Sequence, residues 1–420
     1  MAVGLEVLKN YHPVNGVRIG IAQAGIKYQG RNDLVIFELA EGSRVSGVFT
    51  LNAFCAAPVQ VSKKHLSEAD TRYLVINTGN ANAGTGPQGM VDALATCEQL
   101  ATLTGVETSQ ILPFSTGVIG EPLPMTKLLS GLSPALDNLA ADTWSQAATG
   151  IMTTDTLPKG YSQQVNIAAT DADDSEIDSE IDSEIITVSG ISKGAGMIMP
   201  NMATMLAYLT TDAVIAKPLL DVMCKEMADK SFNRVTIDGD TSTNDSCMLI
   251  ATAKAEMAEI SSKDDPRYSA LFDALLEAFM VLSHAIVRDG EGATKFVTME
   301  VQQAASVKEA LDVAYTVAHS PLVKTALFAC DANWGRILAA VGRAGVQNMI
   351  LEDIDIYLDD VCIVKNGGRA ASYTEEAGAA IFAQAEITIS IRLGRGDITE
   401  RVWTTDLSHE YVSINADYRS

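Results

Sequence analysis

The chain has 420 residues, 47% of them hydrophobic and 20% charged, which suits a globular protein of two or more domains. Its net charge of −23 disfavours nucleic acid and anionic membrane surfaces as partners. The six cysteines form no CxxC pair and the histidines show no metal-ligand spacing, so we expect reduced thiols and no metal site. The N-terminus has no signal-peptide core, and no apolar run approaches membrane-spanning length. We therefore expect a soluble, cytoplasmic protein.

The first clear elements are a strand, a glycine-rich loop and a helix. The stretch RYLVIN (72–77) predicts a strand, and the amphipathic pattern from Met90 to Leu103 predicts a helix. Between them, TGNANAGTGPQG (78–89) lacks the Gly-Lys-Ser/Thr of a P-loop and fits the dinucleotide fingerprint poorly. We interpret this loop as a tight polar connection packed near an active site.

A threefold acidic repeat, DSEIDSEIDSEI, occupies residues 174–185. Its acidity and low complexity predict a solvated loop tip that can vary without loss of function. The alternative, a loop that binds a divalent cation, would require the carboxylates to converge at fixed turns. Runs of charge are more often solvated faces, so we favour the loop tip.

The stretch KGAGMIMPNMATMLAYLTTD, which begins at Lys193, is unusual. Its glycines and proline interrupt both the helical and the strand period, yet it is too apolar for an ordinary surface loop. From Thr204 the pattern becomes that of a buried strand ending at Asp212. We predict a bent, buried peptide over residues 193–203 that leads into a core strand.

Later in the chain, two helices and one strand are well marked. Residues 219–232 form an apolar helical face with Pro218 at its start, and Tyr268 to Val287 predicts a longer helix. The stretch EITISIRL (386–393) alternates strictly, which is typical of a strand with one buried face. This mixture of elements predicts an α/β or α+β protein with several sheets.

Threonine is the candidate nucleophile that remains when the other classes are set aside. A GxSxG elbow is absent, and no histidine lies near a serine or cysteine nucleophile motif. A threonine hydroxyl becomes a good nucleophile when the residue is an N-terminus, because its own α-amine can take the proton. Cleavage of the glycine-bordered peptide before Thr204 would create such a terminus. Read from the residues alone, a plain core strand that begins with Ala-Thr is the better interpretation.

Several motifs, in order along nearly the whole chain, resemble those of the ornithine acetyltransferase family of arginine biosynthesis, also called ArgJ. They are NTGNANAGTG, ILPFSTGVIGEPLP, TTDTLPK, KGAGMIMPNMATMLAYLTTDA, FNRVTIDGDTSTNDS, RDGEGATKF, CDANWGRILAAVGRAG and YVSINADYRS. The sequence departs from the family at the acidic repeat, which looks like an insertion. It also ends in serine, where relatives often end in threonine.

The resemblance implies that the chain cleaves itself between Ala203 and Thr204, giving fragments of 203 and 217 residues (420 − 203). Thr204 would be the nucleophile and its new amine the general base. The Thr116 hydroxyl and the Gly117 amide, in FSTGV, would form the oxyanion hole. Read without the family, this Ser-Thr-Gly would be only a turn.

The resemblance also implies a set of substrate-binding residues. Lys193 would suit the α-carboxylate of N-acetylornithine, and Glu291 would suit its δ-ammonium. Read alone, both would be ordinary surface charges. The implied set is Thr153, Lys193, Thr204, Glu291, Asn415 and Ser420. Ser420 is the last residue, so either its hydroxyl or its terminal carboxylate could act.

The implied reaction moves the acetyl group of N2-acetyl-L-ornithine to L-glutamate through an acetyl-threonine intermediate. No metal or prosthetic group takes part, and the sequence leaves open whether acetyl-CoA is a co-substrate. Two alternatives remain: an amide hydrolase or aminopeptidase of the same self-processing fold, and an uncleaved binding protein without enzymatic activity.

The implied fold is a layered αββα core over residues 1–300 with a smaller α/β domain over 301–420, whose C-terminal tail returns to the active site. The implied assembly is a dimer of cleaved pairs, α2β2.

Overall fold

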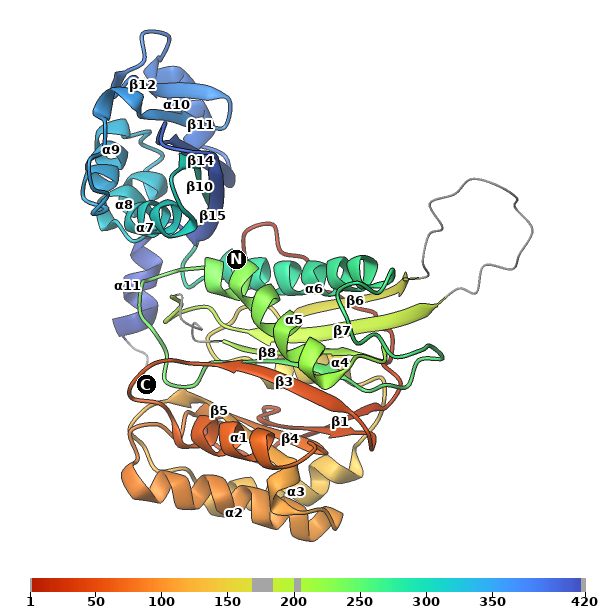
Figure 1. Cartoon of the computed structure of the whole chain (residues 1–420). Helices are drawn as coiled ribbons and strands as arrows, with labels where there is room; N and C mark the ends of the chain where they lie inside the picture. The colour runs from red at the N-terminus through yellow and green to blue at the C-terminus, as the bar shows by residue number, and fades with distance from the viewer. Residues whose placement is uncertain (1, 168–183, 200–204, 417–420) are drawn as a thin grey trace, which may run out of the picture.

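Two sheets lie face to face in the larger part of the molecule, and helices cover the outer face of each (Figure 1). The computed structural model describes residues 2–167, 184–199 and 205–416. Four of the described strands form the first sheet, in the order β1-β2-β4-β5. Their bounds are Val17–Ala22 (β1), Leu34–Leu39 (β2), Tyr73–Asn80 (β4) and Ile111–Val118 (β5). Only the β4–β5 pair is parallel in this sheet as described.

Five of the described strands form the second sheet, in the order β3-β9-β8-β7-β6. Their bounds are Arg44–Phe49 (β3), Lys159–Asn166 (β6), Ile185–Lys193 (β7), Leu206–Thr211 (β8) and Ser246–Ala251 (β9). β8 runs parallel to β9, and the other described neighbours are antiparallel. The predicted core strand that follows the bent peptide is therefore a central strand of this sheet.

Large aromatic side chains fill the interface between the two sheets. Tyr208 on β8 packs on Phe37 and Phe114 of the facing sheet, with ring centroids 5.4 and 5.3 Å apart. The short helix α4 (Trp144–Gly150) places Trp144, which is fully buried, in the same interface. Because strands that face a partner sheet must bury one side, this interface explains the apolar residues of the inner faces.

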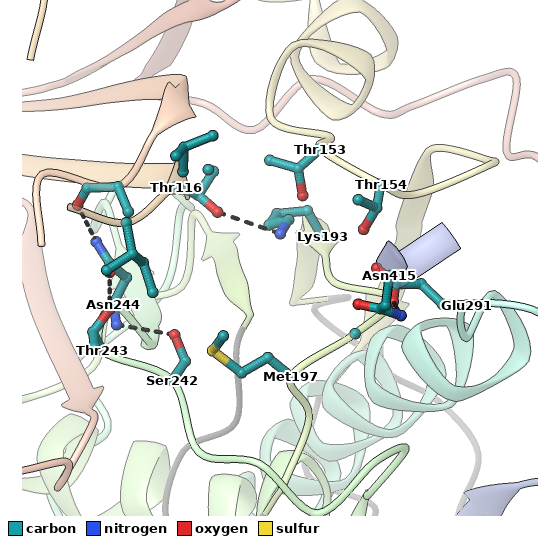
Figure 2. A pocket seen from close by; sticks show the side chains of 15 residues that line it. Thr116, Thr153, Thr154, Lys193, Met197, Ser242, Thr243, Asn244, Glu291 and Asn415 are labelled. Atoms are coloured by element: carbon teal, nitrogen blue, oxygen red, sulfur yellow. Dashed lines mark hydrogen bonds between the residues drawn. The ribbon is translucent and has the colours of Figure 1, made fainter. Parts of the chain in front are cut away.

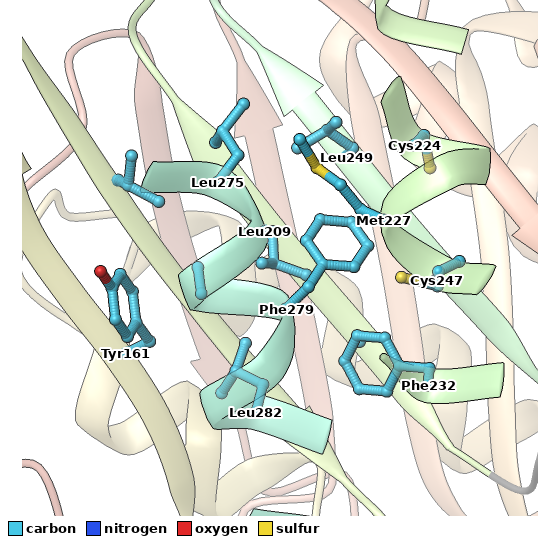
Figure 3. Close-up of a cluster of buried hydrophobic side chains, with 14 of the residues drawn as sticks. Tyr161, Leu209, Cys224, Met227, Phe232, Cys247, Leu249, Leu275, Phe279 and Leu282 are labelled. Atoms are coloured by element: carbon cyan, nitrogen blue, oxygen red, sulfur yellow. The ribbon is translucent and has the colours of Figure 1, made fainter. Parts of the chain in front are cut away.

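Helices complete the layers on both sides. Three helices cover the outer face of the four-stranded sheet: α1 (Ala57–Glu68), α2 (Gly86–Thr104) and α3 (Met125–Asp137). The helices α5 (Lys217–Lys230) and α6 (Tyr268–Arg288) cover the five-stranded sheet. Between these helices and the sheet is a hydrophobic core, in which Phe279 of α6 packs near Met227 of α5 and near Leu209 and Leu249 of the sheet (Figure 3). The molecule thus has the layered αββα arrangement that the resemblance implies, and the expected α/β fold class is confirmed.

The sequence analysis overlooked one property of α6. By length and composition this helix could cross a membrane, although no apolar run of such length is expected from the sequence. Its buried face carries residues such as Leu275 and Phe279 and packs on the five-stranded sheet, as the face of a core helix does.

The C-terminal part of the chain forms a smaller unit around a third sheet. Six described strands have the order β13-β12-β11-β14-β10-β15. Their bounds are Phe296–Ala304 (β10), Asp355–Leu358 (β11), Val361–Lys365 (β12), Gly368–Arg369 (β13), Glu386–Arg392 (β14) and Ile398–Thr405 (β15). The helices are α7 (Val307–Ala318), α8 (Pro321–Phe328), α9 (Trp334–Gly342) and α10 (Glu375–Phe382). Residue 300, where the sequence analysis divides the chain, lies inside β10 of this sheet.

The remaining described helices are three short 3₁₀ turns and the final helix. The 3₁₀ turns are Thr108–Gln110 (η1), Phe232–Arg234 (η2) and Leu351–Asp353 (η3). The final helix, α11 (His409–Ala416), leaves the small unit and runs back toward the αββα core (Figure 1).

Most predicted elements are present, with shifted ends. The strand predicted over 72–77 continues to Asn80, and α2 begins at Gly86, four residues before the predicted start. The helix can begin there because Pro87 lies in its first turn, where a backbone N–H has no partner inside the helix. The helix predicted over 219–232 is α5, displaced by two residues for the same reason.

Two predictions about the middle of the chain need correction. Lys193 is the last residue of β7, a strand that the sequence analysis did not predict, so the bent segment begins at Gly194. The repeat is not a loop tip throughout, because Ile185, although exposed, begins β7, and Glu184 pairs with Arg267 at 3.0 Å. Residues 174–183 of the repeat lie outside the described residues.

Candidate active site

A cavity of about 270 Å³ opens where the ends of β5 and β7 meet the loops before β9 and after α6, beside α11 (Figure 2). Its walls come from both halves of the chain. It is lined by Ala81, Thr116, Gly117, Val118, Ile119, Thr153, Thr154, Lys193, Gly196, Met197, Ser242, Thr243, Asn244, Glu291 and Asn415.

Thr116 and Gly117 lie near the end of β5, where it runs parallel to β4. Gly117 has a φ of +134°, and a Cβ there would lie 2.3 Å from the backbone carbon of Gly79. Only glycine fits this close approach of two strands. The Thr116 hydroxyl accepts a hydrogen bond of 3.3 Å from Lys193 Nζ, as Figure 2 shows. Because the lysine donates, the Thr116 proton can be donated to another oxygen, as an oxyanion hole requires.

Asn244 fixes the neighbouring wall of the cavity. Its amide nitrogen donates to the carbonyl oxygens of Ala81, at 2.6 Å, and Ser115, at 2.9 Å. These bonds tie the loop before β9 to the glycine-rich loop and to the residue before Thr116. Because Ala81 lines the cavity, the prediction that the glycine-rich loop packs near an active site is consistent with the structure.

Lys193 is buried, with 3% of its surface exposed, and burial lowers its pKa while Asp155 opposes that shift. Asp155 accepts hydrogen bonds from the backbone nitrogens of Gly194, at 2.7 Å, and Thr153, at 2.9 Å. The carboxylate therefore holds the peptide that follows Lys193 against the segment that carries Thr153.

A buried ion-pair network supports this wall from behind. Lys159 Nζ lies 2.6 Å from both Asp155 and Asp289, and all three side chains are at most 1% exposed. Burial alone would raise the pKa of Asp155, but the ammonium groups of Lys159 and Lys193 hold it well below its usual range. Asp289 also accepts from the backbone nitrogen of Thr156 at 2.9 Å. The network thus links the segment after α4 to the end of α6.

Glu291 and Asn415 come together although they are far apart in the chain. The Asn415 amide donates to the Glu291 carboxylate at 2.8 Å, and the Glu291 backbone nitrogen donates to Ala195 O at 2.8 Å. A Cβ on Gly196 would lie 2.5 Å from the same carboxylate, so a side chain there would displace the Glu291 carboxylate. The C-terminal helix α11 therefore completes the cavity.

Asp245 adds a buried carboxyl group beside Met205, at the start of the segment that leads into β8. It is fully buried just before β9 and accepts from the Met205 backbone nitrogen at 2.9 Å. Its other oxygen has no hydrogen-bond partner within the described structure, and burial raises the pKa of this group well above its usual value. Met205 is the first described residue after residues 200–204.

The cavity brings together six of the residues that the resemblance implicates, from five separate segments: Thr116, Gly117, Thr153, Lys193, Glu291 and Asn415. Ala203, Thr204 and Ser420 lie outside the described residues. Within the described part of the chain, no group of three or more His, Cys, Asp or Glu side chains could hold a metal ion.

Sequence reasoning missed the supporting residues. Asp155, Lys159, Asp289 and Asn244 all lie within motifs quoted for the resemblance, but nothing in their local pattern distinguishes them from surface polar residues. Only their burial and mutual contacts reveal their place in the site.

Comparisons with known proteins place the chain in a family. The model of the ArgJ family matches residues 18–420. Proteins named arginine biosynthesis bifunctional protein ArgJ are 59% identical in Pseudomonas syringae pv. tomato, over 420 residues, and 53% identical in Psychrobacter arcticus, over 421 residues. In both comparisons the match covers 100% of each chain.

Solved structures of similar proteins include two that carry related names. An arginine biosynthesis bifunctional protein ArgJ from Bacillus halodurans is 38% identical, with a TM-score of 0.47; the match covers 49% of this chain and 96% of that one. An ornithine acetyltransferase from Mycobacterium tuberculosis, solved with ornithine, is 32% identical, with a TM-score of 0.37 and coverage of 45% and 92%. On the family match and on the full-length identities, the chain belongs to the ArgJ family.

Proposed function

We propose that this protein is a glutamate N-acetyltransferase that moves acetyl from N2-acetyl-L-ornithine to L-glutamate in arginine biosynthesis. The observation that carries the proposal is the cavity in which Thr116, Gly117, Lys193, Glu291 and Asn415 converge. Family membership supports the same activity, since full-length relatives are named arginine biosynthesis bifunctional proteins.

The first step would be attack of the Thr204 hydroxyl on the acetyl carbonyl, with the threonine α-amine as general base. Thr116 Oγ1 and the Gly117 backbone nitrogen would donate to the oxygen that becomes negative. Two such fixed donors stabilise a transition state by several kcal/mol, because roughly 2.7–4 kcal/mol is lost when one is removed. Ornithine would leave with the proton, and Thr204 would carry the acetyl ester.

The second step would be attack of the glutamate α-amine on that ester, which releases N-acetylglutamate and restores the hydroxyl. Lys193 would attract the α-carboxylate of either amino acid, together with Thr153 and the C-terminal Ser420. Glu291, held by Asn415, would attract the side-chain ammonium of ornithine. These steps use no metal or prosthetic group. Acetyl-CoA would enter only as an alternative acetyl donor.

The processing step would be self-cleavage between Ala203 and Thr204, which frees the α-amine used as base. We propose that the two fragments stay together, because both contribute strands to the five-stranded sheet. The α2β2 dimer of such pairs is proposed from the family resemblance alone. A cytoplasmic location is supported by the six cysteines, which are all free in the structure.

The decisive assay measures ornithine release from N-acetylornithine with and without glutamate. We expect release to be far faster with glutamate and to be matched by formation of N-acetylglutamate. Release at the same rate without glutamate would instead identify an amide hydrolase. On a denaturing gel, two fragments of 203 and 217 residues are expected, whereas a single uncut chain would favour a binding protein without this chemistry.

A further inference from the structure

A second cavity, of about 150 Å³, adjoins the candidate active site. The two cavities share part of their walls, namely Gly117, Val118, Thr153 and Thr154. The second is further lined by Lys27, Tyr28, Arg31, Gly79 and Ile414. The two cavities therefore adjoin along these shared residues.

The two cavities differ in the balance of charges that line them. The first is lined by one described cation and one described anion, Lys193 and Glu291. The second has two described cations, Lys27 and Arg31, and no acidic residue in its described lining. In a chain with a net charge of −23, such a basic cavity attracts anions locally, because half-buried charges are screened less than exposed ones.

The segment that carries these cations is held in place by the fold. The Asp33 carboxylate, at the start of the four-stranded sheet, accepts from the backbone nitrogens of Ala24 and Ile26, both at 2.6 Å. The Arg31 guanidinium donates to the carbonyl oxygen of Met152, the residue before Thr153. The Arg31 guanidinium and the backbone that leads to Lys27 are thus positioned relative to the active-site wall before a ligand arrives.

The two amino acids of the proposed reaction differ mainly at the end of the side chain. Ornithine ends in an ammonium, which suits Glu291, whereas glutamate ends in a carboxylate, which Glu291 would repel. We infer that Lys27 and Arg31 form an acceptor subsite that binds the side-chain carboxylate of glutamate while its α-amine faces the acetyl group. This inference rests on the proposed function, and it gives the second cavity the role of selecting an acidic acceptor.

The test compares Lys27→Ala with the wild-type enzyme in steady-state acetyl transfer. In a two-step transfer, kcat/KM for each substrate reports its own half-reaction. We expect kcat/KM for glutamate to fall roughly tenfold, the loss carried by one charged hydrogen bond. The value for N-acetylornithine should not fall, because its α-carboxylate is assigned to Lys193 and its side chain ends in an ammonium, which Lys27 does not attract.

Three comparisons sharpen the test. Lys27→Arg should restore most of the glutamate value, and Lys64→Ala, which removes an exposed charge on α1, should leave it unchanged. Glutamine, which has the shape of glutamate without the charge, should be a poor acceptor for the wild-type enzyme. Its disadvantage relative to glutamate should shrink roughly tenfold in Lys27→Ala.

Other outcomes would overturn the inference. An unchanged kcat/KM for glutamate in Lys27→Ala, or an equal fall for both substrates, would rule out the subsite while leaving the proposed function intact. A fall for acetyl-CoA alone would assign the cations to phosphate groups instead. Absence of any acetyl transfer to glutamate by the wild-type enzyme would reject the proposed function and the subsite together.

Discussion

Gly117 shows how a single residue combines a packing requirement with the proposed chemistry. Its φ is +134°, and its Cα faces the backbone of Gly79 on the parallel strand, so a side chain has neither the conformation nor the space it needs. The same close approach fixes the direction of the Gly117 backbone nitrogen at the cavity wall.

The Gly117→Ala variant should therefore lose activity through backbone displacement. We expect kcat to fall about 10²-fold or more, the effect of losing one oxyanion donor. The measurement is steady-state acetyl transfer, with circular dichroism to verify folding. Gly342→Ala is the matched control, because a Cβ there meets nothing within 4 Å, and it should retain full activity. Full activity in Gly117→Ala would contradict the assigned donor.

Thr204 lies outside the described residues, so its prediction rests on the proposed function. Thr204→Ala should give a single uncut chain without transferase activity, because one hydroxyl serves both cleavage and transfer. Thr204→Ser should still be cut and keep some activity, since serine also carries a hydroxyl. A denaturing gel and the acetyl-transfer assay check both variants. An active Thr204→Ala protein, cut or uncut, would exclude this mechanism.

Lys159 joins two buried carboxylates that support the candidate active site. Replacing it with methionine keeps much of the volume but leaves the carboxylates of Asp155 and Asp289 buried without their shared cation. Breaking a buried pair in this way typically destabilises a protein by about 3–5 kcal/mol. We expect a large fall in the urea unfolding midpoint of Lys159→Met and reduced activity. Lys308→Met, whose ion pair with Asp312 is exposed, should show little change in either.

At the scale of elements, β6 and β7 form a hairpin whose connection contains the repeat. Beyond the paired strands, the Ile167 backbone nitrogen donates to Glu184 O at 2.9 Å. Arg267, before α6, donates to both carboxylate oxygens of Glu184 at 3.0 Å. Glu184, at the end of the connection next to β7, is therefore bonded to the folded protein. The acidity of the repeat had predicted a solvated tip there.

Two deletions separate these parts of the repeat. Removing residues 174–183 should leave cleavage, turnover and unfolding midpoint nearly unchanged, because a low-complexity acidic segment carries few core contacts. Extending the deletion through Ile185 should lower the unfolding midpoint, because Arg267 loses its bidentate partner and β7 its first residue. Thermal unfolding and the acetyl-transfer assay distinguish the two. Equal effects of both deletions would show that Glu184 and Ile185 contribute nothing to stability or activity.

At the scale of the whole molecule, His284 lies at the junction between the αββα core and the small unit. On α6, its ring packs on Trp403 of β15 and Phe296 of β10, with centroids 4.4 and 5.3 Å away. Its Nε2 is buried and has no hydrogen-bond partner in the described structure. Burial, reinforced by the charge of Arg288, lowers the pKa of His284 to about 4.

This histidine should make the folded state sensitive to acid. Between about pH 6.5 and about 4 the unfolded chain binds more protons at this position, so its contribution to stability falls as pH decreases, by up to about 3 kcal/mol. In His284→Phe that loss should be absent. Between about pH 7.5 and about pH 5, the unfolding midpoint of the variant should therefore fall less than that of the wild-type protein. Parallel loss of stability in both proteins would show that His284 does not carry the effect.

The sequence by itself determined much of this protein. Strict alternation predicted β14, the helical periods predicted α5 and α6, and an apolar run predicted the central strand β8. The motifs quoted for the resemblance were sufficient to predict the family and the layered fold. Such features are local, because propensity and periodicity act over a few residues, and so they can be read along the chain.

Only the tertiary structure decided which polar residues work together. Asn415 reaches Glu291 across 124 residues, and Lys159 reaches Asp289 across 130. The same holds for the cavity that Lys27 and Arg31 line beside Thr153. No local pattern marks these partners, because their meeting depends on how two sheets, α6 and α11 pack, and packing of distant segments leaves no periodic signal in the chain.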